Sequence, residues 1–113
     1  MAQICFRKIG LPIINGIELV ELDTIRWCAA DSNYSIFHMV CGKRIVVTRT
    51  LKTYENRLPS GVFVRIHQSS IINLNRIVKY TAGDGGLVLM DDGTELQVAR
   101  SRKGDLLTLI RDL

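Results

Sequence analysis

The sequence predicts a mostly β fold, built from small antiparallel sheets of short strands with one short internal helix and a C-terminal helix. Three observations support this prediction: short apolar segments recur along the chain, turn sequences separate them, and only two segments show helical spacing. The length of 113 residues suits one domain with a substantial core. Residues 1–113 are therefore expected to form a single domain.

The expected strands are bounded by short turn sequences rich in glycine, asparagine and aspartate. These turn sequences are Asn15-Gly16, Asp31-Ser32-Asn33, Cys41-Gly42-Lys43, Gly83–Gly86 and Asp92-Gly93. The strands beside them read LPII, IELV, IRWCAA, YSIFHMV, RIVVTR, IVKY, LVLM and TELQV. Asn-Gly is the strongest hairpin signal, because both residues tolerate the left-handed backbone of a two-residue turn. Neighbouring strands are expected to pair antiparallel.

Two segments have apolar residues at helical spacing. In LKTYENRL, Leu51, Tyr54 and Leu58 fall on one stripe, and a proline follows. Thr50 can serve as the N-cap of this helix. A second helix is expected to begin at Ser101 and to cover the end of a sheet with an apolar stripe: Leu106, Leu107, Leu109, Ile110 and Leu113.

The composition, 47% hydrophobic and 23% charged, is that of an ordinary soluble protein. No apolar run approaches the roughly 18 residues of a membrane helix, and the first residues lack a signal-peptide pattern. We therefore expect a cytoplasmic protein without membrane contact.

Three widely spaced cysteines, Cys5, Cys28 and Cys41, lie among apolar residues without a Cys-x-x-Cys pair. Buried, reduced thiols are the expected state. His38 and His67 show no ligand spacing with the cysteines, so no metal site is predicted.

Positive charge is concentrated in the middle of the chain. Residues 32–83 contain eight basic residues against one acid, Glu55, which makes +7 and leaves −3 for the rest of a chain whose total is +4. A smaller basic cluster follows at Arg100, Arg102 and Lys103. Segregated charge of this kind indicates one positive face and an anionic partner such as nucleic acid, with a merely solvated basic surface as the alternative.

The sequence contains no recognisable active site. The glycines of Gly83–Gly86 lie between two expected strands, outside the strand-to-helix context of a phosphate loop. Asp91-Asp92-Gly93-Thr94 lacks the further oxygen ligands of a calcium site and fits a hairpin turn. Neither histidine has a nucleophile near it in sequence. We therefore expect a protein that is not an enzyme, without cofactor or small-molecule substrate.

The strand FVRIH is expected to carry polar groups on one face. Alternation places Phe63, Arg65 and His67 on that face and turns the two aliphatic residues to the other. Because an unpaired buried charge is costly, this cationic face is not expected in a core unless Arg65 is paired. An ion pair of Arg65 with Glu55 or Asp31 is the alternative to contact with a phosphate.

Directly after this strand come residues suited to nucleic acid. The amide of Gln68 can make a bidentate contact with an adenine edge, while Ser69 and Ser70 can donate to phosphate oxygens. Asn73 is instead expected to satisfy local backbone groups.

Two other segments offer similar chemistry. Asn33 and Tyr34 lie at a turn, where polar and aromatic tips can reach outward. VARSRK lies where the last strand ends and the last helix begins. Arg100 there could contact guanine, while the helix N-terminus and Lys103 face a phosphate. Solvated surface charge is the alternative for Arg102 and Lys103.

These segments, in this order and at these intervals, resemble the LytTR family, the DNA-binding output domain of bacterial response regulators. The resemblance covers about residues 9–109 and rests on Asn-Tyr, Thr-Leu-Lys…Leu-Pro, Phe-x-Arg-x-His-x-Ser, the GDGG hairpin and Val-x-Arg. It implies small, mostly antiparallel sheets and a transcriptional regulator that binds double-stranded DNA. Loops, not a recognition helix, would enter successive major grooves at direct repeats in promoters.

Carried over position by position, the resemblance implies two sets of contacts. Base edges would be contacted by Asn33, Tyr34, Gln68 and Arg100. The phosphate backbone would be contacted by a larger basic and polar set: Arg49, Lys52, Arg65, His67, Ser69, Ser70, Arg102 and Lys103.

The sequence departs from the family pattern after the histidine of FVRIH. A basic residue is common in the family where this chain has Gln68, and an aromatic residue or histidine is common at the position of Ser70. These departures leave the predicted fold unchanged. An amide in place of a cation is expected to favour adenine over guanine at that contact.

Family members of this kind normally follow a phosphorylated receiver domain, and no receiver sequence is present here. We therefore expect the C-terminal part of a two-component response regulator, with a stand-alone regulator as the alternative. A β-rich protein-interaction module with a basic face for an acidic partner is the rival of another class. Binding of single strands would need stacked aromatic residues, which an aromatic content of 6% does not favour.

Overall fold

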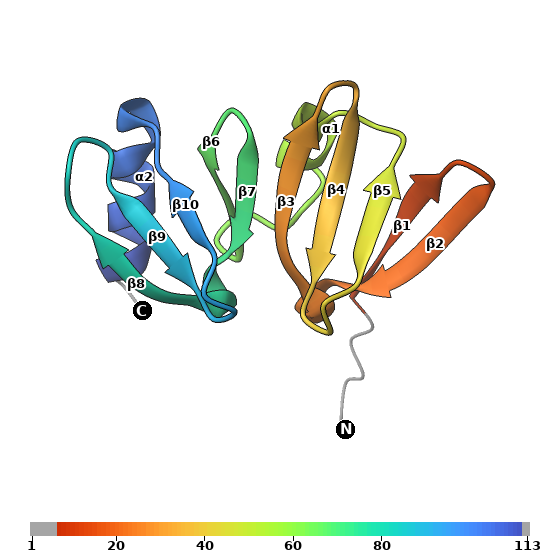
Figure 1. Ribbon diagram of the computed structural model, residues 1–113, viewed down its shortest axis with the longest axis horizontal. Helices are drawn as coiled ribbons and strands as arrows, with labels where there is room; N and C mark the ends of the chain where they lie inside the picture. The colour runs from red at the N-terminus through yellow and green to blue at the C-terminus, as the bar shows by residue number, and fades with distance from the viewer. Residues whose placement is uncertain (1–6, 112–113) are drawn as a thin grey trace.

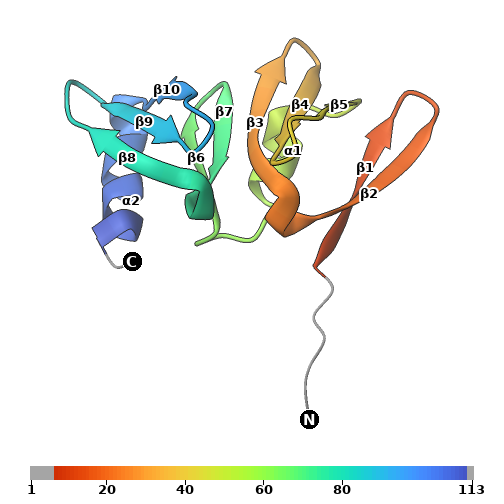
Figure 2. The same ribbon diagram turned by 60° about the horizontal axis from the view of Figure 1, so that its bottom comes forward.

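The computed structural model describes residues 7–111, which form three antiparallel sheets, two α-helices and two short 3-10 turns. Figures 1 and 2 show the three sheets side by side, with a two-stranded hairpin at one end of the molecule and the C-terminal helix at the other. The predicted mostly β fold with an internal and a C-terminal helix is confirmed.

The sheets are small and their strands are short. The first sheet is the hairpin of β1 (Lys8–Ile13) and β2 (Gly16–Glu21). The second has the order β5-β4-β3-β7-β6: Arg44–Val47, Tyr34–Met39, Ile25–Asp31, Ser70–Asn73 and Phe63–His67. The third has the order β10-β9-β8: Glu95–Gln97, Leu87–Met90 and Ile77–Thr81. The helices are α1 (Leu51–Glu55) and α2 (Arg100–Arg111).

The hairpin turns form at the predicted turn sequences, with one shift in position. Between β1 and β2 the turn residues are Ile14 and Asn15, because Gly16 already pairs with Ile13. Between β3 and β4 the turn is Ser32-Asn33, and Ser32 has a left-handed backbone with φ 57°. The other turn sequences also connect paired strands: 41–43, 83–86 and 92–93.

Helix α1 begins where predicted and ends early. Thr50 has the extended backbone of an N-cap, although its side chain makes no capping hydrogen bond. The helix ends at Glu55, because the N–H groups of Arg57 and Leu58 both donate to the carbonyl of Tyr54 and tighten the last turn.

Helix α2 packs against β6 and begins at Arg100, one residue before the predicted start. Leu106 is buried, and Leu109 and Ile110 are half-buried against the same core. The helix therefore covers the sheet with three members of the predicted apolar stripe, whereas Leu107 is half-buried and does not belong to this core. Leu113, the last member of that predicted stripe, lies outside the described residues.

Two hydrophobic cores lie on the two faces of β7, which is buried along its whole length. Because successive strand residues point to opposite faces, Ile71 packs in the first core with β1, β3, β4, β5 and α1, and Ile72 packs in the second with β9 and α2. The β6–β7 turn is therefore held from both sides.

Asn73 ends β7 and is buried. Its side-chain oxygen accepts a hydrogen bond from the N–H of Asn75 at 2.9 Å, which confirms the predicted local role. Its amide also donates to the carbonyl of Ile25 at 2.9 Å, a partner distant in sequence that joins β7 to the start of β3.

The prediction of buried thiols is confirmed at Cys28 and wrong at Cys41. Cys28 lies fully buried in the first core, and burial raises the pKa of its thiol. Cys41 is exposed because it lies in the turn between β4 and β5, where side chains face solvent. Cys5 lies outside the described residues.

Candidate nucleic-acid interface

Three segments that are distant in sequence meet at one edge of the molecule: the β3–β4 turn, the β6–β7 turn and the junction of β10 and α2 (upper edge in Figure 1). Backbone hydrogen bonds join them in a row. The N–H of Ala30 donates to the carbonyl of Ser69 at 2.9 Å, and the N–H of Ala99 donates to the carbonyl of Ile66 at 2.8 Å. The segments predicted to contact DNA are therefore neighbours.

A bulge in β6 shapes the middle segment. Arg65 pairs with Ile71, but His67 already pairs with Ser70, so the register shifts between Arg65 and His67. The predicted alternation of FVRIH is therefore wrong in part. Phe63, expected on the polar face, is buried in the first core, while β6 also contributes to the second.

Arg65 holds the β6–β7 turn from within. Its Nε donates to the carbonyl of His67 at 3.0 Å, and its Nη2 donates to the carbonyl of Gln68 at 2.6 Å. Its Nη1 forms an ion pair of 2.6 Å with Glu55, one of the two acids expected as alternatives to a phosphate. With 13% of its side chain exposed, Arg65 shapes the turn and is not free to reach a phosphate.

The tip of the turn presents one amide and a linked pair of polar groups. Gln68 is exposed. Nδ1 of His67 accepts the N–H of Ser69 at 3.2 Å and lies 2.8 Å from the Ser69 hydroxyl, which orients the imidazole. Ser70 is only 5% exposed. Its predicted contact with phosphate is therefore not supported, because β7 is buried from its first residue.

The β3–β4 turn presents Asn33, which is exposed, and Tyr34, which is 47% exposed. The buried hydroxyl of Ser35 donates to the carbonyl of Arg49 at 2.7 Å. That bond brings the segment after β5 beside the turn, so Arg49 lies at the same edge. Both Arg49 and Lys52, on α1, are exposed.

The start of α2 lies beside the loop between β8 and β9. Arg100 is 82% exposed, with its Nε 3.8 Å from a carboxylate oxygen of Asp84, and Lys103 donates to the carbonyl of Asp84 at 3.4 Å. An open hollow of about 440 Å³ is lined by this loop, His67 and the β10–α2 junction. The edge thus alternates exposed donors with a concave surface.

Glu55 connects two of the predicted DNA-contacting cations. Besides its pair with Arg65, it lies 3.4 Å from Nη1 of Arg102 on α2. Partial burial acts to raise the pKa of Glu55, but the hydrogen bond and charge of Arg65 and the charge of Arg102 outweigh it and lower the pKa. The single negative charge of Glu55 therefore offsets part of the positive charge of Arg65 and Arg102 and holds both side chains within the protein.

Sequence reasoning considered Glu55 only as one possible partner of Arg65, and it assigned no role to Asp84. Glu55 did carry a signal, because it is the single acid within the basic region 32–83. Asp84 carried none, because its turn sequence already explained it. Its left-handed backbone, φ 55°, turns the β8–β9 loop toward α2.

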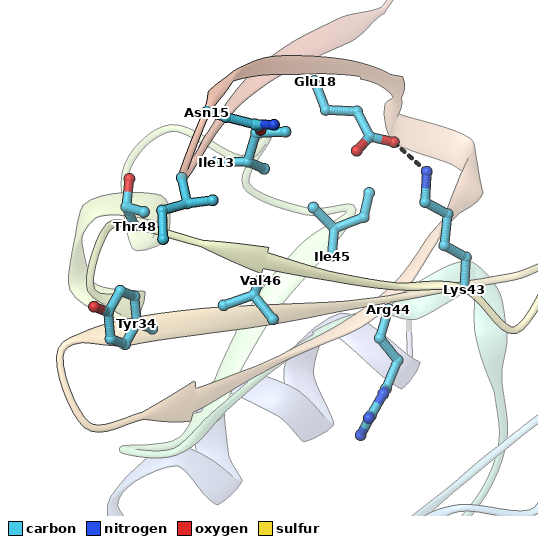
Figure 3. A pocket seen from close by; sticks show the side chains of 10 residues that line it. Ile13, Asn15, Glu18, Tyr34, Lys43, Arg44, Ile45, Val46 and Thr48 are labelled. Carbon is cyan, nitrogen blue, oxygen red and sulfur yellow. Dashed lines mark hydrogen bonds and ion pairs between the residues drawn. The ribbon is translucent and has the colours of Figure 1, made fainter.

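A second hollow, of about 400 Å³, lies between the β1–β2 hairpin and β5 (Figure 3). Figure 3 shows Ile45 and Val46 of β5 among its lining, Tyr34 at one end, and Lys43 and Glu18 at the other. Lys43 and Glu18 form an ion pair of 2.5 Å. It adjoins the turn at Tyr34 but contains none of the other predicted DNA-contacting residues.

Among residues 7–111, no three His, Cys, Asp or Glu side chains gather closely enough to hold a metal ion. No helix in the same part of the chain is both long and apolar enough to span a membrane.

Comparison with known proteins identifies relatives of the chain. A family model described as the LytTr DNA-binding domain matches residues 15–111. The sensory transduction protein LytT of Bacillus anthracis is 28% identical over 107 residues, which cover 92% of this chain and 43% of that protein. The CO-responsive transcriptional regulator RcoM of Rhodospirillum rubrum is 31% identical over 88 residues, 77% of this chain and 37% of that protein.

A solved structure has the same fold. The LytTr DNA-binding domain of a response regulator from Bacillus cereus superposes with a TM-score of 0.79 at 22% identity, over 92% of this chain and 96% of that one. The chain spans less than half the length of the curated relatives that it matches.

Proposed function

Because this chain belongs to the LytTR family of DNA-binding domains, we propose that it binds double-stranded DNA in a sequence-dependent way, as the DNA-binding domain of a transcriptional regulator. The observation that carries the proposal is the row of three segments at one edge, joined by backbone hydrogen bonds. Loops ordered before binding lose less conformational entropy when they meet DNA.

The proposal divides the polar residues of this edge by what they are free to do. Exposed side chains with donors or acceptors at the three tips would contact base edges in the major groove: Asn33, Tyr34, Gln68 and Arg100. Exposed or half-exposed donors around them would contact phosphates: Arg49, Lys52, His67, Ser69 and Lys103. Arg65 and Arg102 would act mainly by holding the loops.

In the full protein we propose that this single domain is joined to a phosphorylated receiver domain and acts in the cytoplasm as the output of a two-component system. The name and length of the matched LytT protein support a larger regulator. Pairs of such domains would occupy direct repeats in promoters, because each domain presents one edge to a few base pairs.

Selection from a randomised duplex library at about 150 mM salt tests this function. The domain is expected to enrich a repeated short element, and Arg100→Ala or Gln68→Ala to lose that enrichment while still retaining DNA. As a control, the same selection is carried out with the wild-type domain and a single-stranded version of the library. No sequence element should be enriched from it.

Retention of DNA without enrichment would contradict the proposed function and favour the rival, an interaction module whose basic face takes an acidic protein. Sequence-blind attraction to phosphates would then explain all binding, and affinity would fall with salt equally for every duplex.

A further inference from the structure

We propose that Glu55, an acid that touches no base, sets how well this domain distinguishes its preferred DNA sequence from others. Glu55 is a positioning residue, because it holds the β6–β7 turn and the start of α2 in one arrangement. The inference rests on the proposed function and extends it to a residue outside the contacting set.

The first observation is that one carboxylate joins three elements. Glu55 is the last residue of α1. One of its oxygens pairs with Arg65 of β6 at 2.6 Å, and the other lies 3.4 Å from Arg102 of α2. Two of the three DNA-facing segments are thus attached to the same acid.

The second observation is that Arg65 uses all three guanidinium nitrogens inside the protein. Two of them donate to the carbonyls of His67 and Gln68, and the third is held by Glu55. A planar guanidinium with its third corner fixed cannot turn, so the two carbonyls keep their positions. Without Glu55 the group could rotate, and the carbonyl of Gln68 would move with it.

Stability alone does not account for this arrangement. The Glu55 side chain is 33% exposed, so its pair with the more buried Arg65 adds less to the free energy of unfolding than a fully buried pair would. The effect of Glu55 is therefore expected in the geometry of the turn. Arg65 binds the carbonyl of Gln68 and the carbonyl of the residue before it. A change in the geometry of the turn would therefore move the Gln68 side chain and its base contact without unfolding the domain.

The charge of Glu55 and its positioning role predict different changes in affinity when Glu55 is replaced, so the two effects can be distinguished. An acid near a DNA-binding edge repels phosphates, so replacing it with a neutral residue should strengthen binding to every duplex. A positioning role predicts that the same replacement weakens binding to the preferred duplex relative to others. The ratio of the two affinities distinguishes the effects.

The experiment compares the wild type with Glu55→Gln on two duplexes, the one selected by the wild-type domain and a shuffled version of it. For Glu55→Gln we expect affinity for the shuffled duplex to rise and the ratio of affinities to fall about tenfold, the factor of one charge-assisted hydrogen bond. The melting temperature and the far-ultraviolet circular dichroism should change little.

Asp105→Asn is the matched control. Asp105 is exposed on α2, three residues after Arg102 in the sequence, and forms no ion pair within residues 7–111. Its replacement by asparagine removes the same charge as Glu55→Gln, but Asp105 does not hold a loop in place. Affinity for both duplexes should rise together, so the ratio should stay at the wild-type value.

Arg65→Lys supplies a second variant that keeps the charge. A lysine cannot hold two carbonyls and a carboxylate at once, so the ratio should fall as it does for Glu55→Gln, without a rise in affinity for the shuffled duplex. This variant also decides the matter if Glu55→Gln fails to fold.

An unchanged ratio in Glu55→Gln, or in Arg65→Lys where that variant has to stand in, overturns the positioning role. Equal affinity of the wild type for the two duplexes overturns the proposed function instead. The wild-type ratio is measured first, so the two failures are distinguished.

Discussion

At the scale of single residues, this edge contains two kinds of polar group that look alike in the sequence. Arg65 and Gln68 are both donors beside one turn, yet Arg65 is held by three partners whereas Gln68 is exposed. A held donor shapes the surface, and an exposed one can exchange water for a base edge. Burial therefore decides which donors can carry sequence preference.

Gln68 allows a direct test of base preference. We expect Gln68→Arg to change the preferred base at one position from adenine to guanine, because an amide matches adenine and a guanidinium matches guanine. The change should be worth about 1–3 kcal/mol at that base pair. Parallel selections with both proteins measure it, and guanine in the wild-type element would contradict the assignment.

Burial and a neighbouring charge at His38 are expected to make the stability of the protein depend on pH. It stacks on Trp27 with ring centroids 4.3 Å apart. Burial and the charge of Arg44 lower its pKa below 6.5, although Asp92 acts in the opposite direction. The unfolded chain therefore binds a proton at His38 at a higher pH than the folded chain, so the free energy of unfolding should decrease as the pH falls below 6.5.

The variant His38→Phe keeps a ring against Trp27 and removes this proton. We expect its stability to vary less than that of the wild type as the pH falls from 6.5 toward 5, measured by urea denaturation. The pKa values of Glu55 and Asp92 are also lowered, from their ordinary values of 4.5 and 3.8. Protonation of these carboxylates therefore reduces the free energy of unfolding only at a pH below those values. Parallel curves for the two proteins above pH 5 would contradict this role of His38.

At the scale of elements, the β8–β9 loop and the β10–α2 junction pack against each other. The N–H of Val98 donates to the carbonyl of Gly86 at 3.0 Å, and a Cβ on Gly85 would overlap the carbonyl of Val98. Gly85 thus lets the loop approach the strand that leads into α2. The position of Arg100 depends on this close approach.

Replacement of two glycines should therefore have opposite effects. Gly85→Ala is expected to lower the free energy of unfolding by about 1–3 kcal/mol, because the backbone must shift. Gly104→Ala lies within α2 with open space around it and should raise that free energy by about 0.8–1 kcal/mol through helix propensity. Chemical denaturation of both variants checks this, and equal stability of the two would contradict the close approach.

Local signals in the sequence predicted most of these elements. Turn residues marked the hairpins, and Thr50 marked the start of α1. Long-range effects were not predictable in the same way. The bulge after Arg65 depends on how β7 pairs with β6, and the second partner of Glu55 comes from α2, so neither can be deduced from spacing along the chain.

At the scale of the whole molecule, two cores on either side of β7 fix the edge at which the three loops meet. The basic region 32–83 supplies most of the positive charge, and we propose that the three tips supply the contacts with bases. On this proposal, attraction to phosphates and recognition of sequence belong to different residues. They should respond differently to salt, because only the first depends on counterion release.

The most direct test of sequence-dependent binding is fluorescence anisotropy with the selected and the shuffled duplex between about 50 and 200 mM salt. We expect both affinities to fall with salt along similar slopes, while the selected duplex stays at least about a hundredfold tighter throughout. Equal affinities at every salt concentration would contradict sequence-dependent binding and leave only a basic surface.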